Sequence, residues 1–256
     1  MNINKIEKIL AEKAPVKLHF YDEVESTNDI AKAAVKSGKL LGSGDMSVFI
    51  SVKQTKGKGR NGKTFVSPKG GLYMSFVIES LTCESALYIT AAASVAVVDA
   101  VELLTAKPCK IKWVNDVILN GFKICGILAE KIDDIIVLGI GINVSTAAED
   151  FPSELKKIVN SVENITGKKI DINQFAAEII LNINNEVKKL NNKEYDFIKK
   201  YRSKSNLIGK EINIIKGKNI RTASALDIDD DCSLVVEYTD DKSKENLRYG
   251  EVSIKY

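Results

Sequence analysis

The strongest constraint on how this chain can fold is a glycine-rich, cationic segment that separates two strand-like runs. In residues 54–63, Gly57, Gly59 and Gly62 alternate with lysines and an arginine, and apolar sequence lies on both sides. Glycine lets the backbone approach a ligand closely. Exposed backbone N–H groups beside Lys and Arg form a cradle for anionic oxygens. The segment therefore predicts a strand–loop–strand unit that binds an anion.

The spacing of these glycines excludes two common phosphate-binding motifs. A P-loop needs glycine, four residues and then Gly-Lys-Ser/Thr, and the dinucleotide fingerprint needs Gly-x-Gly-x-x-Gly in a strand-to-helix setting. Neither occurs in residues 54–63. A run of lysine and glycine is also typical of a solvated hairpin tip, so composition alone leaves both interpretations open.

Two further cationic positions favour the binding interpretation. Lys112, the single tryptophan Trp113 and Asp116 lie close together at the end of an apolar run, and Lys123 opens the next strand-like segment. Cation-bearing segments that separate successive strands are expected to meet at one pocket. The sequence therefore predicts a shared site for an anionic ligand.

Composition limits the class of protein. The 256 residues carry 37 basic and 34 acidic side chains, a net charge of +3, which lacks the basic excess of a dedicated nucleic-acid binder. The four cysteines, at positions 83, 109, 125 and 232, are scattered, and His19 is the single histidine, so no zinc site is expected. We expect His19 to be structural. Isolated thiols in a chain without a signal peptide favour the reducing cytoplasm.

Hydrophobic patterns predict a mixed α and β chain. Strands are expected at 16–24, 46–52, 72–78, 109–114, 117–120, 124–131 and 135–143. Helices are expected after a cap at Ser26 or Thr27, from about 84 to 104, and within 172–200, and short strands follow Arg202. The uncharged stretch 85–98 is shorter than the roughly 20 residues of a membrane span. We therefore expect a buried core helix there.

Two hairpin turns are predicted within the strand-rich region, at Asn120-Gly121 and at Asp133-Asp134. Strict alternation in the strand that follows the first turn would place Lys123 on the same face as Cys125, with Gly126 on the opposite face. Glycine at that position would permit the close approach of a ligand or a neighbouring strand.

Taken in order, the motifs resemble those of the biotin protein ligase family from about Phe20 to the C-terminus. The matching motifs are Ser26-Thr27-Asn28, the 57–63 loop, Ser67 to Tyr73, Lys112 to Asp116, Lys123 with Gly126-Ile127-Leu128 and Glu130, Gly139 to Val144, Tyr201-Arg202, Leu207 to Lys210, and Gly250 to Ser253. Lys58 and Lys63 stand where the family usually has arginine, and Val114 stands where it has proline. Arg60 is retained.

The resemblance implies an α+β fold, in which helices flank a central mixed sheet like that of class II aminoacyl-tRNA synthetases. A small SH3-like β-barrel would follow at the C-terminus. We expect a catalytic domain at 1–203 and the barrel domain at 204–256. The implied enzyme is an ATP-dependent ligase that forms biotinyl-5′-AMP and pyrophosphate from biotin, ATP and Mg²⁺. It would then transfer biotin to one lysine of a biotin carboxyl carrier domain.

The resemblance also assigns roles to residues of this chain. Expected catalytic residues are Lys123, Arg60, Asp116 and Lys112, with Asp116 also the expected Mg²⁺ ligand. Biotin would contact Ser26, Thr27, Asn28, Gln54, Gly57, Lys58, Gly59, Arg60, Lys123 and Gly126. The nucleotide would contact Lys58, Arg60, Trp113, Asn115, Lys123 and Asn143, although core packing is the simpler role for Trp113.

Two alternatives remain at this point. A lipoate protein ligase shares the chemistry, but the cationic loop and the C-terminal Gly250 to Ser253 motif favour biotin. A non-catalytic biotin sensor or repressor would need a DNA-binding module, and the residues before Ser26 are too few for one. We therefore expect no DNA and no membrane partner, and either a monomer or a homodimer.

Overall fold

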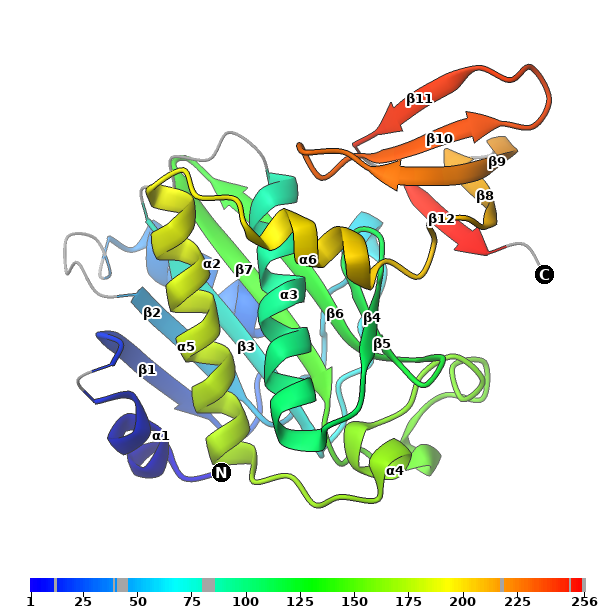
Figure 1. Cartoon of the computed structure of the whole chain (residues 1–256). Coiled ribbons are helices and arrows are strands. Elements are labelled where there is room, and N and C mark those ends of the chain that lie inside the picture. The colour runs from blue at the N-terminus through cyan, green and yellow to red at the C-terminus, as the bar shows by residue number, and fades with distance from the viewer. Residues whose placement is uncertain are drawn as a thin grey trace.

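The computed structural model describes residues 1–11, 13–38, 40, 46–79, 86–216, 219–248 and 250–254, and these form a helix-covered sheet and a smaller second sheet (Figure 1). The helices are α1 (Ile3–Leu10), α2 (Thr27–Lys36), α3 (Ala86–Thr105), α4 (Val162–Thr166), α5 (Ile172–Asn191) and α6 (Phe197–Lys204). The strands of the first sheet are β1 (Val16–Tyr21), β2 (Met46–Ser51), β3 (Gly71–Ile78), β4 (Cys109–Lys112), β5 (Asp116–Leu119), β6 (Phe122–Ile132) and β7 (Ile135–Asn143). Those of the second are β8 (Glu211–Lys216), β9 (Asn219–Ile228), β10 (Leu234–Tyr238), β11 (Lys244–Leu247) and β12 (Glu251–Ile254).

The first sheet is mixed, as the resemblance implied. Its strand order is β1-β2-β3-β7-β6-β5-β4, with β1 and β2 parallel and the remaining neighbours antiparallel. The predicted turns join these strands: Asn120 and Gly121 both have positive φ (48° and 84°), and Asp133 has φ of 50°. Such dihedral angles are those of tight hairpin turns that twist with their strands.

One face of this sheet carries the main core. Alternate residues of β3, from Leu72 to Ile78, are buried there with the side chains of α3 and α5, and both helices lie in front of the sheet in Figure 1. Helix α3 is long and apolar enough to cross a membrane by composition, yet most of it is buried inside the protein. It is therefore a buried core helix, as predicted.

The opposite face is covered by α2 at one end and left open at the other. Phe49, Val77 and Val137 pack with Ala31 and Val35 of α2. Further along β7 the residues on this face become glycines, which cannot fill the space that α2 leaves. The change from valine to glycine along one strand face therefore opens a cleft beside the start of α2.

Helix α2 begins where the sequence predicted. Ser26 is its N-cap, and the Ser26 Oγ accepts a hydrogen bond from the backbone N–H of Asp29 at 3.4 Å. The cap fixes the first turn, which buries Thr27 and Asn28 against the sheet. The predicted helical region 172–200 is divided instead into α5 and α6, with Lys193 at positive φ between them.

The second sheet is antiparallel, in the order β11-β10-β9-β8-β12, consistent with the expected small SH3-like domain. Figure 1 shows it beyond α6, at the β4 end of the first sheet. The indole Nε1 of Trp113 donates a hydrogen bond to the carbonyl of Cys232, 3.0 Å away, and so ties the two sheets together. Trp113 is buried there, in agreement with the core role that we considered simpler.

The described cysteines and the histidine are structural. Cys109, Cys125 and Cys232 are free and buried, and burial raises the pKa of the Cys109 thiol to about 12. Cys83 lies outside the described residues. His19 stacks on Phe49 with ring centroids 4.5 Å apart, and burial lowers its pKa.

Candidate functional site

A cleft of about 740 Å³ lies on the open part of the sheet face that carries α2. Strands β3 to β7 form its floor, the start of α2 and the 58–66 loop form its walls, and residues of the C-terminal sheet reach its far end. All but one of the predicted site residues line it: Ser26, Thr27, Asn28, Gln54, Lys58, Gly59, Arg60, Lys112, Trp113, Asn115, Asp116, Lys123, Gly126 and Asn143.

Gly57 is the exception and does not line the cleft. A β-carbon there would lie 2.3 Å from the Ser67 Oγ and 2.4 Å from the carbonyl oxygen of Phe65. Its role is therefore to let the loop pack against residues 65–67, which support the Gln54 side chain from behind. A direct contact between Gly57 and biotin stays a prediction.

The cationic segment forms a small hairpin over the cleft. The backbone N–H of Phe65 donates to the carbonyl of Gly57 (2.9 Å), and that of Gly59 donates to the carbonyl of Lys63 (2.7 Å). A 3-10 turn, η1 (Arg60–Gly62), closes it, with Asn61 and Gly62 at positive φ. Glycine adopts a positive φ at little cost, as at Gly62, and permits tight packing, as at Gly57, which accounts for two of the glycines in this segment.

Neutral hydrogen-bonding groups line one end of the cleft. Gln54 Oε1 accepts from the backbone N–H of Thr27 (2.8 Å), and Gln54 Nε2 donates to the Ser67 Oγ (3.0 Å). The Ser75 Oγ lies 2.7 Å from the Thr27 Oγ1 and 2.5 Å from the Asn28 Oδ1. These contacts fix the orientation of several uncharged donor and acceptor groups at this end of the cleft. Such a lining suits a ligand group that is polar but uncharged.

Glycines form the floor next to this end, and an aromatic ring lies on them. A β-carbon on Gly141 would lie 2.6 Å from the Phe65 Cε1, and one on Gly126 would lie 2.9 Å from the Phe65 Cε2. A β-carbon on Gly139 would lie 2.3 Å from the Asn28 Oδ1. The three glycines therefore leave room for the ring, the amide and an apolar portion of a ligand.

The centre of the cleft holds an ion pair. The Lys123 Nζ lies 2.7 Å from the Asp116 Oδ1 and 5.7 Å from the centroid of the Phe65 ring, with both charged side chains partly buried. Desolvation strengthens such a pair and its attraction for anionic oxygens. The pair can therefore orient the ammonium group of Lys123 toward a ligand between the two halves of the cleft.

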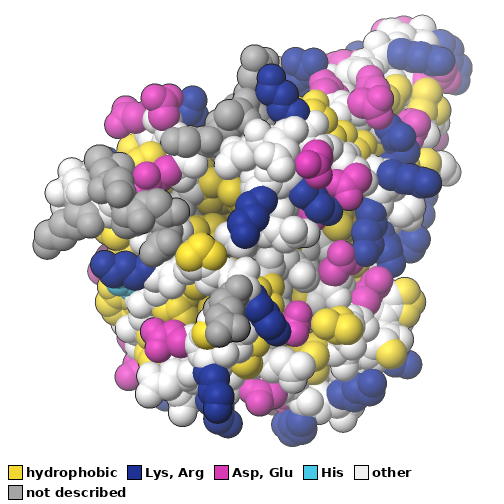
Figure 2. Space-filling model, turned by 60° about the vertical axis from the view of Figure 1, so that its left-hand side comes forward, with side chains coloured by type: hydrophobic (Ala, Val, Ile, Leu, Met, Phe, Trp, Pro, Cys, Tyr) yellow, Lys and Arg dark blue, Asp and Glu magenta, His cyan; other side chains and the backbone are white. Residues whose placement is uncertain are grey.

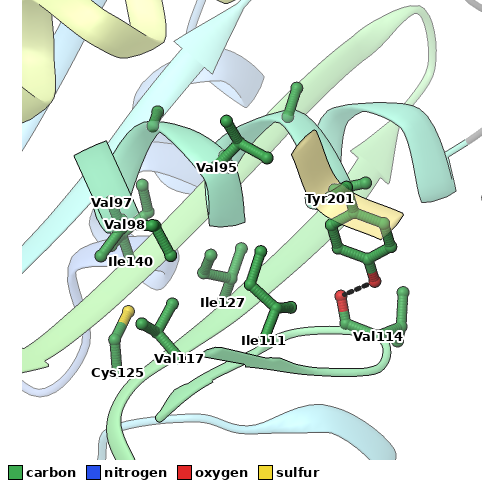
Figure 3. Packing of buried hydrophobic residues seen from close by; sticks show 14 of the residues in the cluster. Val95, Val97, Val98, Ile111, Val114, Val117, Cys125, Ile127, Ile140 and Tyr201 are labelled. Atoms are coloured by element: carbon green, nitrogen blue, oxygen red, sulfur yellow. Dashed lines mark hydrogen bonds between the residues drawn. The ribbon is translucent and has the colours of Figure 1, made fainter. Parts of the chain in front are cut away.

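The predicted strand alternation around Lys123 is wrong. A bulge places one extra residue, Ile124, in β6, so that Ile118 pairs with Lys123 while Asp116 pairs with Gly126. Lys123 consequently shares the cleft face with Gly126, and its Cε lies 3.3 Å from where a β-carbon on Gly126 would be. Cys125 points into the core on the other face, as Figure 3 shows. A β-bulge reverses the facing of the residues beyond it, which strict alternation cannot anticipate.

Arg60 lies across the cleft from the strands. Its Nη1 donates to the Asn115 Oδ1 at 3.3 Å, and the Asn115 Nδ2 donates to the carbonyl of Ile127 at 2.8 Å. The carbonyl of the neighbouring Val114, whose peptide bond with Trp113 is cis, accepts from the buried Tyr201 hydroxyl (2.9 Å; Figure 3). The loop guanidinium is thus connected to a strand end that is itself held by the core.

Cations dominate the rest of the lining. Among the described residues that line the cleft, Asp116 is the single carboxylate, against the cations Lys58, Arg60, Lys63, Lys110, Lys112, Lys123 and Lys210. Lys110 and Lys112 share one face of β4, and neither has an ion-pair partner in the described part of the chain. Asn143 also lines the cleft, and its Oδ1 is buried without a hydrogen-bond partner among the described residues. A cleft that holds both a buried acceptor without a partner and unpaired cations is suited to an anionic ligand that carries donor groups.

Sequence reasoning missed the roles of Phe65, Ser75 and Glu130. The Asn28 Nδ2 donates to the Glu130 Oε2 at 2.7 Å, and Ser75 and Phe65 contact the residues described above. Glycines at 139 and 141 were the available signal, because two glycines on one strand face indicate side chains or a ligand approaching that face.

Comparisons with known proteins agree with this geometry. Residues 22–146 match the model of the biotin/lipoate A/B protein ligase family, and residues 207–255 match that of the biotin protein ligase C-terminal domain. The bifunctional ligase/repressor BirA of Bacillus spizizenii is 34% identical over 161 residues, which cover 60% of this chain and 48% of that protein. The chain thus spans about half the length of that relative.

Two further proteins are similar over more of their length. The biotin–[acetyl-CoA-carboxylase] ligase of Mycobacterium tuberculosis is 29% identical over 219 residues, 83% of this chain and 80% of that protein. The structure of the biotin protein ligase from Aquifex aeolicus in complex with biotin and ATP superposes with a TM-score of 0.81 at 28% identity, covering 93% of this chain and 98% of that one.

Proposed function

Because the chain belongs to the biotin protein ligase family, we propose that it is an ATP-dependent ligase that attaches biotin to a carrier protein. Biotin and ATP would first give biotinyl-5′-AMP and pyrophosphate. The biotinyl group would then pass to one lysine of a biotin carboxyl carrier domain. The observation that carries the proposal is the distribution of charge along the cleft, which is neutral and polar at one end and strongly cationic from its centre outward.

The neutral end suits the ureido ring of biotin. That ring is uncharged and carries both donors and a carbonyl acceptor, which match the amides and hydroxyls of Asn28, Thr27 and Gln54. The glycine floor at 126 and 141 leaves space for the apolar part of the molecule. Biotin bound in this direction would point its carboxylate toward Lys123.

The first half-reaction joins two anions that repel each other, the biotin carboxylate and the α-phosphate of ATP. The cations of the cleft would reduce this repulsion. A carboxylate oxygen of biotin attacks the α-phosphorus of ATP, a new P–O bond forms, and the bond to pyrophosphate breaks. Lys123, between the two subsites, would hold the carboxylate and the α-phosphate together, while Arg60 stabilises the charge that develops on the phosphate oxygens. Asp116 would orient Lys123 through the ion pair described above.

The outer part of the cleft would hold the nucleotide. Lys112 is suited to phosphate contacts, and Asn115 and Asn143 offer amide groups to the nucleoside. Lys58, whose ammonium pairs with Asp29 on α2, would act by holding the loop over the site. The indole N–H of Trp113 already binds the Cys232 carbonyl, so core packing is the role that we propose for this side chain.

Magnesium is part of the proposal as an ion that arrives with ATP. The described residues contain no group of three His, Cys, Asp or Glu side chains that could hold a metal alone. Mg²⁺ commonly uses one or two carboxylates together with substrate phosphates and water, and Asp116, the carboxylate that lines the cleft among the described residues, would be one of them. The ion would neutralise charge on the phosphates when bound.

The second half-reaction needs only an approaching amine. The ε-amino nitrogen of the carrier lysine attacks the acyl carbon of biotinyl-5′-AMP, the bond to the phosphate oxygen breaks, and AMP leaves as the amine loses a proton.

We propose that residues 1–203 perform both steps and that residues 204–256 form the separate small domain. A cytoplasmic location belongs to the same proposal. Acidic and basic side chains are mixed over much of the face shown in Figure 2, and several Lys and Arg side chains gather toward its right-hand side.

Carrier modification tests the proposal directly. The purified chain is incubated with ATP, Mg²⁺ and an isolated biotin carboxyl carrier domain, with biotin or lipoate as the acid, and the carrier mass is measured. We expect one biotinyl group on one lysine, no lipoyl transfer, and no product with Lys123→Met. Transfer of lipoate but not biotin, to a lipoyl carrier supplied in parallel, would contradict the proposal.

A further inference from the structure

A continuous chain of charged contacts joins the neutral end of the cleft to the cationic loop. The Asn28 Nδ2 donates to one oxygen of Glu130 (2.7 Å), and the Lys32 Nζ donates to the other (2.8 Å). Lys32 also lies 3.2 Å from the Asp29 Oδ1, which accepts from the Lys58 Nζ at 2.6 Å. Asn28, Asp29 and Lys32 share the first turns of α2, whereas Glu130 is on β6 and Lys58 is in the loop.

The first link determines which way the amide of Asn28 points. Its Oδ1 faces the Ser75 hydroxyl at 2.5 Å, so its Nδ2 must face Glu130. Gly139 lies beneath this amide and leaves no room for a side chain there. A carboxylate partner is therefore what prevents the amide from rotating by 180° and exchanging its donor for its acceptor.

The last link holds the loop. Asp29 and Lys58 are part-exposed, with side-chain exposures of 38% and 43%. Burial alone would raise the pKa of Asp29, but hydrogen bonds from Lys58 and Lys32 outweigh it and keep that pKa below its ordinary value. The Asp29 carboxylate therefore accepts from the Lys58 ammonium at neutral pH, and the loop is fastened to α2 at a residue adjacent to Asn28.

Lys32 connects the two links. Its ammonium contacts both carboxylates, and although burial lowers its pKa, Glu130 and Asp29 together raise it above the ordinary value. If either carboxylate were lost, the Lys32 ammonium would pair with the remaining carboxylate alone. A change at the loop can therefore reach the amide of Asn28 through charged groups, without a change in the sheet.

We propose that Glu130, Lys32 and Asp29 are positioning residues that couple the orientation of Asn28 at the ureido subsite to closure of the 57–65 loop through Lys58. The inference rests on the proposed function for the identity of the ligand. It goes beyond that function because none of these three residues touches the reacting atoms. Biotin that engages Asn28 would, in this network, favour the closed loop, and the closed loop would hold biotin more tightly.

The chain supplies a matched control for the loop contact. Glu25, just before α2, and Lys56, just before the 57–65 loop, form a second ion pair at 2.8 Å, with side-chain exposures of 66% and 67%. This pair makes no contact with Lys32 or Glu130. Glu25→Gln and Asp29→Asn each remove the carboxylate partner of one lysine, Lys56 or Lys58, and leave every loop residue in place.

The first experiment needs no ligand. Trypsin cleaves after lysine and arginine, so the rate of cleavage after residues 58, 60 and 63, mapped by mass spectrometry, reports how often the loop opens. We expect Asp29→Asn to raise this rate about threefold to fivefold, the effect of losing one part-exposed ion pair. Glu25→Gln should change it by less than about 1.5-fold. Equal rates in both variants and the wild type would overturn the role of Asp29.

The second experiment tests the coupling by biotin binding in calorimetry. Asp29→Asn and Glu130→Gln should each weaken biotin binding about threefold to tenfold, and their effects should be less than additive when Lys32 is present. In a Lys32→Met background the same two changes should be additive. Additivity in both backgrounds would refute the coupling, even if each single effect is found.

The two experiments separate this inference from the proposed function. If the wild type binds biotin and the variants bind it equally well, the coupling fails and the proposed ligase activity stands. If the wild type does not bind biotin, the proposed function fails and the ureido coupling fails with it, while the trypsin result still decides whether Asp29 holds the loop.

Discussion

Replacing Gly141 with alanine would put a methyl group into the floor of the cleft, where Phe65 lies. The new β-carbon would be 2.6 Å from the Phe65 Cε1 and 3.1 Å from two further ring atoms. Carbon atoms in contact prefer about 3.5–4.0 Å, so the ring must move by about 1 Å. It cannot slide along the floor, since it also covers Gly126, and it must therefore rise into the space assigned to biotin.

The cost of this movement should appear in ligand binding. Overpacking typically costs about 1–3 kcal/mol, which corresponds to a loss of affinity of about 5- to 150-fold. We expect Gly141→Ala to weaken biotin binding in calorimetry by a factor in that range, with a small change in melting temperature. Phe65→Leu combined with Gly141→Ala should recover part of the affinity, because the smaller side chain removes the clash.

The double variant makes the reasoning refutable. Wild-type affinity in Gly141→Ala would mean that biotin does not use the floor between strands β6 and β7. Equal losses with and without Phe65→Leu would mean that the ring is not the group displaced. Either result would require a different position for the ligand.

Three other predictions test separate parts of the account. Lys123→Met should lower biotin-dependent adenylation by at least about a hundredfold while the melting temperature stays within a few degrees, because a charge in the reaction centre is lost; activity near the wild-type level would show that another cation bridges the substrates. Trp113→Phe should lower the free energy of unfolding by about 1 kcal/mol in denaturant titration, because the hydrogen bond to Cys232 is lost. The KM for ATP should stay unchanged. A raised KM with unchanged stability would instead indicate a nucleotide contact. Burial raises the pKa of Glu186 despite the nearby Lys189, so the ionised form of Glu186 destabilises the fold. Glu186→Gln should therefore be more stable than the wild type at pH 7, and the difference should develop as the pH rises from the ordinary pKa of the carboxyl group through its raised value. A stability difference that does not depend on pH would contradict the burial argument.

Local sequence patterns predicted much of the fold because the relevant interactions are local. The positive φ of Asn120 and Gly121 follows from turn chemistry that two adjacent residues specify. The Ser26 cap likewise depends on residues within one helical turn. The division between α5 and α6 was missed, because helical periodicity continues past Lys193 although the backbone turns there.

The site was harder to predict, because its geometry depends on segments that are far apart in the chain. The order of motifs indicated that Lys123 and Arg60 belong to one cleft, and both line it. The face on which Lys123 lies was predicted wrongly, since the bulge at Ile124 is set by pairing with β5. Glu130 was noted as part of a motif, yet its contact with Asn28 joins residues 102 positions apart and no local pattern reveals it.

The central claim is that this cleft joins biotin to the α-phosphate of ATP, and biotin-dependent ATP–pyrophosphate exchange measures that step without a carrier protein. The account predicts exchange that requires biotin, that lipoate does not support, and that Lys123→Met abolishes. Absence of exchange with biotin in a folded preparation, or exchange that lipoate alone supports, would contradict it.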